Sequence, residues 1–496
     1  MATIKESDIQ ESITGALQYI SYYHPEDFIK GMIEAYDLEQ SPAAKNAIGQ
    51  ILINSKMCAM GHRPICQDTG SVNVFVKIGL NATLELSKEL EDVINEAVAL
   101  AYLDPSNTLR FSIVSDPAGA RINTKNNAPA VIHFSVDNSS VVDIKVAAKG
   151  GGSENKAKFA ILNPSDSVYD WVMETVKGMG AGWCPPGMLG IGIGGNPEKS
   201  MLLAKEALMQ KVDIHELKQR GAKNNLEELR LKLYEDINKI GIGAQGLGGL
   251  TTVLDVKILD YPCHAASLPV AIIPNCAATR HIHFTLDGSG TAVFEKPDLS
   301  IWPDLELPIK DVKRINVDEL NKVDLKQFKA GETVLISGKI LTARDAAHKK
   351  IVEYKKANKP LPNGVNLENK LIYYVGPVNP VGNEVVGPAG PTTASRMDKF
   401  TQDMMELNIL GMIGKAERKQ PTIDLIKKYA SIYFIATGGA AYLIAQSIKK
   451  SKIVAFEELG MEAIYEFEVK DMPLIVGVDS FGESVHTNGP KQWSRI

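Results

Sequence analysis

A change in local amino-acid composition near the middle of the chain constrains its fold more than any other feature. From about residue 287 to residue 325 the sequence carries three prolines among isolated charges, which suits neither a helix nor a central strand. The chain has 496 residues, enough for two to four domains at roughly 150 residues each. We therefore expect an N-terminal domain over residues 1–286, an interdomain connection over 287–330 and a C-terminal domain over 331–496.

The composition is that of an ordinary globular protein, with 44% apolar and 23% charged residues. The formal net charge is -5 and both signs are interleaved, which argues against a nucleic-acid partner and against a polybasic membrane anchor. The first twelve residues carry four charges where a signal peptide needs an apolar core. An uninterrupted apolar run of about 18 residues is missing, so we expect no membrane span and a cytoplasmic protein.

Local patterns predict a mixed α/β protein. Residues 9–60 read as mostly helical, the alternating apolar residues over 72–78 predict a half-buried strand, and residues 86–102 have helical spacing. Residues 130–147 read as a β-hairpin with its turn at 137–139. A second α/β unit is expected from about residue 331 to the C-terminus.

Two glycine-rich stretches invite comparison with nucleotide-binding loops. Gly190, Gly192 and Gly195 fit G-x-G-x-x-G, but no βαβ unit frames them, and the stretch just before them contains two prolines. We interpret them as backbone packed closely against another element. The stretch over 241–249 (GIGAQGLGG) is open to two interpretations, a flexible turn or a functional loop.

The five cysteines are too few and too widely spaced to indicate a disulfide framework. Cys58 follows a helical pattern and Cys263 precedes a histidine, whereas Cys66, Cys184 and Cys276 lie in turn-like segments. Three thiolates from separate loops can hold a soft metal or an iron–sulfur cluster. Scattered core cysteines are the alternative that remains open.

Zinc is the competing metal, but zinc sites usually show closely spaced cysteine or histidine pairs. The sequence has no C-x-x-C, and the His281-x-His283 pair is more typical of a strand with two polar residues on one face.

Two arginines in the C-terminal half stand in suggestive contexts. Arg396 follows a loop rich in proline and glycine, and Arg344 follows a strand-like run. Guanidinium groups match carboxylates in shape and charge, although a surface ion pair explains either arginine alone.

Taken together and in order, seven segments resemble the class I fumarase and tartrate dehydratase family. Four resemble the alpha-type region and three the beta-type region of that family, over residues 66–70, 149–153, 184–186, 275–280, 342–348, 387–396 and 458–463. The resemblance implies a two-domain fold, with an N-terminal α/β domain that holds a cluster and a smaller, swivelling C-terminal domain of β/β/α type. It also implies a homodimer.

The resemblance further implies a [4Fe–4S] cluster, a small dicarboxylate as substrate, and the reversible hydration of fumarate to (S)-malate. The cluster ligands would be Cys66, Cys184 and Cys276. The catalytic residues would be Thr392, Asp68 and His264. The substrate-binding residues would be Gln67, Arg110, Gly150, Gly151, Arg344, Arg396 and Lys415.

Two alternatives stay open. Within the same class of reaction, tartrate or methylfumarate would suit the same cations, although the presence of both regions in one chain favours a fumarase. From another class, a redox sensor would carry a cluster but would not need Arg344, Thr392 and Arg396.

Overall fold

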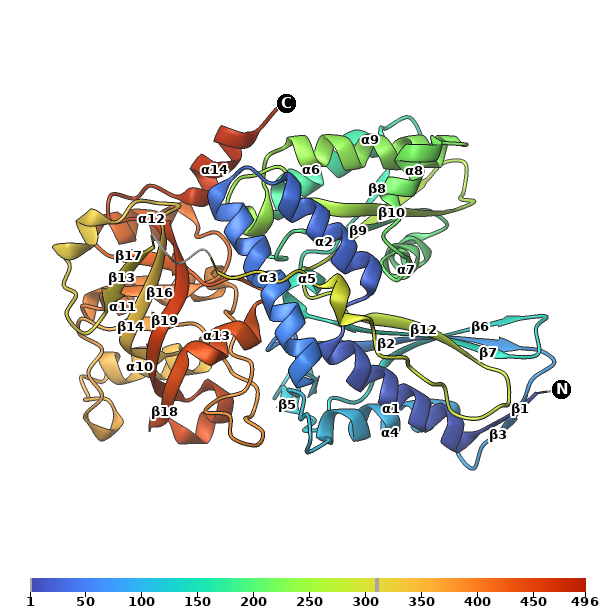
Figure 1. Cartoon of the computed structure of the whole chain (residues 1–496), viewed down its shortest axis with the longest axis horizontal. Helices are drawn as coiled ribbons and strands as arrows, with labels where there is room; N and C mark the ends of the chain where they lie inside the picture. Colours follow the sequence, from blue (N-terminus) through green and yellow to red (C-terminus); the bar gives the residue numbers. More distant parts are fainter. Residues whose placement is uncertain (1, 308–311) are drawn as a thin grey trace.

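The computed structural model describes residues 2–307 and 312–496, so Pro308 of the expected interdomain connection lies outside the described residues. The N-terminal half forms two lobes on one side of the molecule, and the C-terminal half lies on the other side (Figure 1). Between them stand α2 (Glu26–Leu38) and α3 (Pro42–Gly61). The mixed α/β, two-domain fold class is confirmed.

The first lobe is a four-stranded sheet covered by two helices. Its strand order is β12–β7–β2–β6, and α1 packs against α4 on one face of the sheet. The elements of this lobe are β1 (Thr3–Lys5), α1 (Glu6–Tyr22), β2 (Ser71–Gly79), β3 (Thr83–Glu85), α4 (Leu90–Leu103), β4 (Val114–Ser115), β5 (Ile122–Asn123), β6 (Val131–Asp137), β7 (Val142–Lys149) and β12 (His281–Leu286).

The expected helices over 9–60, the strand over 72–78 and the helix over 86–102 are confirmed as α1 to α3, β2 and α4. The expected hairpin over 130–147 is wrong. Both strands exist, but β2 lies between them, pairing in parallel with β6 and antiparallel with β7. β2, whose residues are mostly buried, therefore has a hydrogen-bonded strand on each side. Direct pairing of β6 with β7 would exclude β2 from its place between them.

The second lobe is another four-stranded sheet, in the order β10–β9–β11–β8. Its elements are α5 (Gly151–Glu154), β8 (Lys158–Leu162), α6 (Val168–Met179), β9 (Gly187–Gly194), α7 (Pro197–Ala207), α8 (Ile214–Arg220), α9 (Asn225–Lys239), η1 (Ala244–Gly246), β10 (Val253–Tyr261) and β11 (Leu268–Asn275).

The glycines of the second lobe serve close packing, as the sequence predicts. Gly190 and Gly192 lie inside β9, where a Cβ would stand 2.1 Å from Ala204 O and 1.9 Å from Ser200 O of α7. Helix α7 therefore rests directly on the strand backbone. Asn196 caps this helix by accepting a hydrogen bond from the Lys199 N–H, 3.1 Å away.

The C-terminal half is a closed sheet with helices outside it. β14 pairs with both β15 and β19, and β19 also pairs with β17, so the strands β14–β15–β16–β17–β19 form a ring. The strands are β13 (Lys313–Asn316), β14 (Thr333–Thr342), β15 (Leu371–Tyr373), β16 (Gly411–Gly414), β17 (Ile432–Ile435), β18 (Ile448–Ala455) and β19 (Ile464–Val478).

Around this ring lie α10 (Asp345–Lys356), α11 (Thr401–Glu406), α12 (Gln420–Lys428), α13 (Ala441–Ser447) and α14 (Val485–Trp493), with short turns η3 (Asp324–Gln327), η4 (Pro362–Gly364), η5 (Ala394–Phe400) and η6 (Glu457–Glu462). The short turn η2 (Leu299–Ile301) packs instead against α2. Part of the stretch expected to connect the domains belongs to the sheet, because β13 pairs in parallel with β14.

The two halves share a hydrophobic core. Apolar side chains of α2 and α3, such as Met32 and Ile48, belong to the same buried cluster as Ile351, Ile372 and Ile435 of the C-terminal half. In the part of the chain that the structure describes, no helix combines the length and apolarity needed to cross a bilayer.

Candidate active site

A cavity of about 830 Å³ opens between the two halves and collects many of the predicted residues. Its N-terminal wall comes from the segment before β2, the loop that carries β4 and β5, and the turn from β7 into α5. Its C-terminal wall comes from the start of α10, from η5 and from η6. The predicted residues among its lining are Asp68, Arg110, Gly151, Arg344 and Arg396.

Asp68 stands among cations. Its Oδ2 accepts the Gly151 N–H at 2.8 Å, and its Oδ1 lies 3.4 Å from Arg110 Nη2. Burial opposes ionisation, but Arg110, Arg280 and Lys415 together with the Gly151 N–H outweigh it and hold the pKa of Asp68 below its usual value. The aspartate is thus an anion whose charge is shared by several donors.

The arginines leave the cavity rich in positive charge. Burial, together with repulsion from Arg110 and Arg396 and against the attraction of Glu462, lowers the pKa of Arg344 to about 10. Arg344 Nη2 lies 3.4 Å from Glu462, and its buried Nε has no hydrogen-bond partner among the described residues. Arg396 pairs with Asp345 and is half exposed at the mouth.

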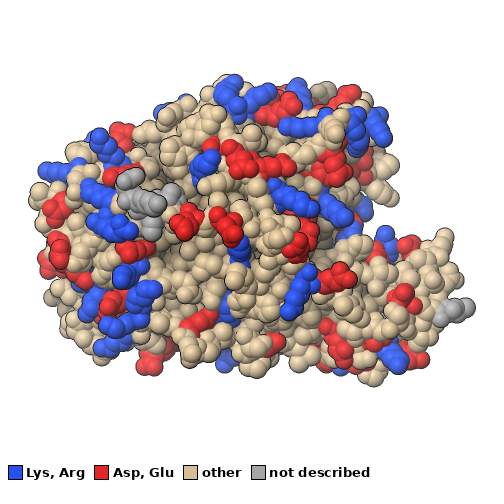
Figure 2. Space-filling view, viewed as in Figure 1, with Lys and Arg blue, Asp and Glu red and all other residues tan. Residues whose placement is uncertain are grey.

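This cationic cavity differs from the outer surface. On the face shown in Figure 2, lysines and arginines are intermingled with aspartates and glutamates. The guanidinium groups of Arg110, Arg344 and Arg396 each have an acidic neighbour, but Arg344 Nε has no hydrogen-bond partner among the described residues. Guanidinium groups that line a cavity suit a ligand with carboxylate groups.

Thr392 and Lys415 lie side by side in the C-terminal half, outside the residues that line the cavity. The Lys415 N–H donates to Thr392 O at 3.2 Å, and the Thr392 N–H donates to Tyr374 O at 2.7 Å. Gln67 extends from the N-terminal half to the C-terminal half, and its Nε2 donates to Pro391 O at 3.1 Å. The Thr392 side chain is buried, so its hydroxyl is shielded from bulk water.

The three predicted cysteine ligands lie around Lys415. The Cys66 thiol lies 3.3 Å from Gln67 Oε1, and Lys415 Nζ donates to Cys184 Sγ at 3.0 Å. The charges of all three sulfurs raise the pKa of Lys415 against the effect of its burial. Burial raises the pKa of Cys66, and it raises that of Cys184 to about 11 in spite of Lys415.

This donor set fits an iron–sulfur cluster. Soft thiol donors from three loops, two of them buried and one partly exposed, lie next to an ammonium group and suit an anionic cluster bound through thiolates. Metal binding would release the protons that burial retains on the thiols of Cys66 and Cys184. Among the described residues, no three His, Cys, Asp or Glu side chains are close enough to hold a single ion, whereas a cluster binds its ligands through different irons.

The remaining cysteines are placed differently. Cys58 is fully buried beside Cys66, in an apolar group that also contains Ile65 and Ala278. Cys263 is exposed in the turn between β10 and β11, where its thiol donates to Ser267 O at 3.2 Å.

The structure does not bring His264 to the cavity. It is exposed in the turn after β10, whose register with β9 runs from Val253 opposite Gly187 to Tyr261 opposite Gly194. Cys184 precedes the first pair and His264 follows the last. At about 3.3 Å per residue, roughly 25 Å separates them within one chain.

Two residues of the site carry no role in the sequence analysis. Arg280 is buried, its Nε has no hydrogen-bond partner in the described part of the chain, and a side chain at Gly150 would begin 3.6 Å from Arg280 Nη2. Lys149 is also buried, and burial lowers its pKa to about 8. Lys149 Nζ donates to Pro274 O at 2.6 Å and so ties β7 to the Cys276 loop. The only signal for either residue was its place inside a motif of the family.

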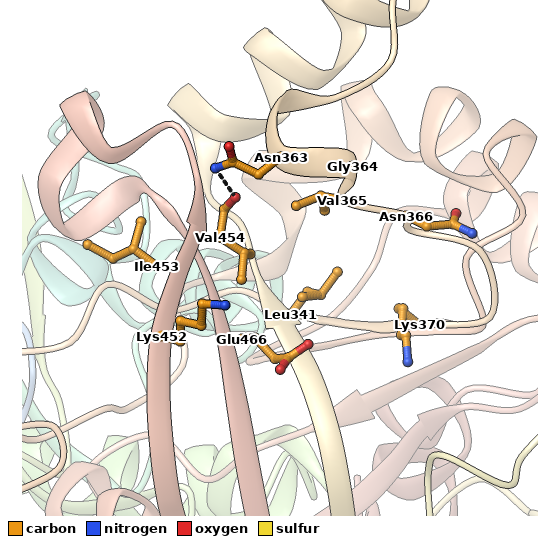
Figure 3. Close-up of a pocket in the computed structure, with 10 residues that line it drawn as sticks. All are labelled: Leu341, Asn363, Gly364, Val365, Asn366, Lys370, Lys452, Ile453, Val454 and Glu466. Atoms are coloured by element: carbon orange, nitrogen blue, oxygen red, sulfur yellow. Dashed lines mark hydrogen bonds between the residues drawn. The ribbon is translucent and has the colours of Figure 1, made fainter.

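A second cavity of about 410 Å³ lies within the C-terminal half, beside β18 and η4 (Figure 3). Asn363 donates to Val454 O there at 3.0 Å, and Lys370, Lys452 and Glu466 supply the charges. Its lining includes none of the predicted site residues, so the cavity between the halves is the candidate active site.

Comparison with known proteins agrees with this geometry. The family model described as fumarate hydratase matches residues 10–285, and the model described as the fumarase C-terminus matches residues 288–489. The chain belongs to the class I fumarate hydratase family. It is therefore an enzyme of the hydro-lyase class.

Relatives extend over most of this chain. The class I anaerobic fumarate hydratase of Escherichia coli is 31% identical over 472 residues, covering 90% of this chain and 83% of the relative. Fumarate hydratase 2 of Leishmania major is 30% identical, covering 95% and 85%. A putative L(+)-tartrate dehydratase subunit alpha of Methanocaldococcus jannaschii is 36% identical over 279 residues, covering 55% and 95%.

Proposed function

We propose that this enzyme hydrates fumarate reversibly to (S)-malate with a [4Fe–4S] cluster held by Cys66, Cys184 and Cys276. One observation carries the proposal. Asp68 and several cations of the cavity lie beside three thiols that are close to one another, two of them buried and that of Cys276 partly exposed.

The arginines would bind the two carboxylates of the substrate. Arg110 and Arg344 repel each other in the free site, so a carboxylate between them relieves that repulsion as well as forming hydrogen bonds. The same cations stabilise the negative charge that spreads onto the carboxylate when the adjacent carbon loses its proton. We assign backbone contacts to Gly150 and Gly151.

When bound, the cluster supplies an iron without a protein ligand, a Lewis acid for the hydroxyl group that malate loses. The chain's own contribution at that place is Lys415, whose ammonium group already donates to Cys184 Sγ. Its positive charge would offset the anionic cluster.

Thr392 would take the carbon-bound proton, with Asp68 as its proton partner. A hydroxyl group is a weak base unless an acceptor and cations activate it. A backbone hydrogen bond holds Lys415 beside Thr392. Asp68 is ionised because Arg110 and Arg280 lie close to it. A substrate carboxylate would draw these cations away from Asp68 and so increase its affinity for a proton.

The remaining assignments belong to the same proposal. Residues 1–286 form the cluster-binding domain, residues 287–330 the connection and residues 331–496 the smaller catalytic domain of a cytoplasmic homodimer. His264 serves the active site of the second chain, because it lies at the far end of its own sheet.

Tartrate is the second candidate substrate, favoured by the likeness of the N-terminal half to the putative tartrate dehydratase subunit. Methylfumarate would suit the same cations. A redox sensor without turnover is disfavoured by the arginines that line the cavity.

The test is anaerobic loss of fumarate absorbance by the reconstituted enzyme, repeated after exposure to air and with tartrate and methylfumarate. Turnover of fumarate that air abolishes supports the proposal, and full activity after air exposure and iron chelation contradicts it. The variant Thr392→Ala should keep its cluster and bind substrate, but its kcat should fall by about 10² or more. Turnover near that of the parent would remove Thr392 from the mechanism.

A further inference from the structure

The glycine-rich loop over 241–249 is not explained by the proposed chemistry. Gly241, Gly243, Gly246 and Gly248 all have φ between 67° and 81°, so the loop follows a path that most residues avoid. It encloses the short turn η1 and lies buried between the second lobe and the C-terminal half.

Gln245 is the exception within this loop. It has φ 54° and ψ 13°, a left-handed conformation that glycine adopts more readily than a residue with a side chain. Such a conformation persists at functional sites when the side chain is needed there. The Gln245 side chain is buried and uses both ends of its amide group.

The two ends of the amide hold two different segments. Gln245 Nε2 donates to Pro185 O at 2.9 Å, directly after Cys184, and Gln245 Oε1 accepts the Gly438 N–H at 2.9 Å. The backbone N–H of Gln245 also donates to Pro185 O, at 2.7 Å. On the other side, His486 Nε2 donates to Gln245 O at 3.1 Å.

Both of these segments meet at the Cys184 sulfur. Cys184 has φ 59°, another left-handed conformation in a residue with a side chain. A Cβ at Gly438 would lie 2.5 Å from Cys184 Sγ and 2.9 Å from Gln245 Oε1. The backbone of the C-terminal half therefore packs directly on the thiol, and Gln245 sets the separation.

We propose that Gln245 is a positioning residue that fixes the Cys184 thiol between the N-terminal and C-terminal halves. It does so by holding the carbonyl after Cys184 and the amide of Gly438 at the same time. This inference rests on the proposed function for its meaning, since Cys184 is a proposed cluster ligand. The requirement for one donor and one acceptor in a single side chain explains why glutamine occupies a position suited to glycine.

The test compares Gln245→Ala and Gln245→Gly in the full chain. Gln245→Gly relieves the left-handed backbone while removing the amide, so it separates the loss of the amide from any backbone strain in Gln245→Ala. The matched control is Gln50→Ala, which removes a buried glutamine on α3 whose Nε2 donates to Asn46 Oδ1 at 3.3 Å.

The first readout does not need the cluster. In the anaerobic apoprotein, alkylation of Cys184, measured by mass spectrometry, should be about tenfold faster in both variants because its loop opens more often. Cys58 should react at the parent rate. An unchanged Cys184 rate in Gln245→Gly would overturn the proposal, whatever the enzyme's activity.

The second readout uses the reconstituted enzyme. Both variants should lose the visible absorbance of the cluster in air several-fold faster than the parent and the Gln50→Ala control. If Gln245→Gly keeps its cluster as long as the parent, the amide is dispensable and the proposal is wrong. If the parent itself binds no cluster, the proposed function fails, while the alkylation rates still decide the role of Gln245.

Discussion

At the scale of single residues, Arg344 shows how the fold keeps a cation ready for a carboxylate. It is the N-cap residue of α10, and its side chain is buried with one nitrogen that has no partner among the residues that the structure describes. One turn later, His348 Nδ1 donates to Arg344 O at 2.8 Å, and its ring stacks on Phe400 with centroids 5.6 Å apart. The arginine backbone is therefore anchored by a buried histidine.

The burial of His348 predicts an acid-sensitive fold. Burial lowers the pKa of His348 to about 4, whereas an unfolded histidine titrates near 6.5. As pH falls from 6.5 to 4, the unfolded chain binds a proton that the folded chain rejects, so the folded state loses roughly 3 kcal/mol. The loss is complete below the folded pKa and absent above 6.5.

The measurement is the free energy of unfolding at several pH values for the parent and for His348→Phe. Phenylalanine keeps the stacking on Phe400 but cannot titrate, so its curve should be flatter between pH 6.5 and 4. Other histidines contribute equally to both proteins and cancel in the difference. Parallel curves would show that His348 does not carry this sensitivity.

At the scale of elements, the contact between β9 and α7 predicts a stability change at one glycine. A Cβ at Gly192 would lie 1.9 Å from Ser200 O, a backbone atom that cannot rotate away. Gly192→Ala should lower the free energy of unfolding by about 1–3 kcal/mol, because α7 must move off the strand.

The matched control is Gly178→Ala on α6, where a Cβ meets nothing within 4 Å. That change should raise stability by about 0.5–1 kcal/mol, since alanine favours a helix over glycine. Urea unfolding of both variants gives the comparison. A Gly192→Ala protein as stable as the parent would mean that α7 lies farther from β9 than these distances indicate.

The same elements show what the sequence could predict. The helices of residues 9–60, the strand over 72–78 and the close packing of Gly190 and Gly192 follow from local periodicity and local chemistry. The pairing of β6 and β7 does not, because β2 inserts between them from about 50 residues earlier in the chain. Strand order depends on contacts that periodicity does not encode.

The residues of the candidate site likewise include some that the sequence predicted and some that it did not. The cysteine loops and the C-terminal arginines stood out by residue type, and the family motifs supplied their roles. Gln245, Arg280 and Lys149 were not predicted, because their roles depend on which carbonyl, amide or carboxylate of another element lies beside them.

At the scale of the whole molecule, α3 and the residues after it join the two halves. Asn54 Nδ2 donates to Gly439 O at 3.0 Å, and its Oδ1 accepts the N–H groups of Tyr442 and Leu443. Arg63 forms a two-pronged ion pair with Glu384, at 2.8 and 3.0 Å. Arg63 Nη1 also donates to Asn107 Oδ1 at 2.7 Å, three residues before Arg110.

Removing Arg63 should weaken the junction between the halves. The variant Arg63→Met leaves the partly buried Glu384 without its ion-pair partner, which costs about 2–3 kcal/mol in the free energy of unfolding. The double variant Arg63→Met, Glu384→Leu should recover part of that loss, since no unpaired charge remains. Urea unfolding measures both. A single variant within about 1 kcal/mol of the parent would contradict this role of the ion pair.

Which active site His264 serves depends on how two chains assemble. Within one chain it lies at the opposite end of the β9–β10 pair from Cys184. If it acts in catalysis, it must reach the active site of the second chain of the proposed homodimer. The variants His264→Ala and Thr392→Ala should therefore both be inactive alone, each for lack of one residue per site.

Mixing these two variants under conditions that exchange subunits separates the possibilities. If His264 acts on the other chain, each mixed dimer has one complete site, formed by Thr392 of one chain and His264 of the other. With random exchange half of the dimers are mixed, so activity should return to about a quarter of the parent value. If His264 served its own chain, every site in the mixture would lack a residue and no activity would return. Full activity of His264→Ala alone would remove this histidine from catalysis.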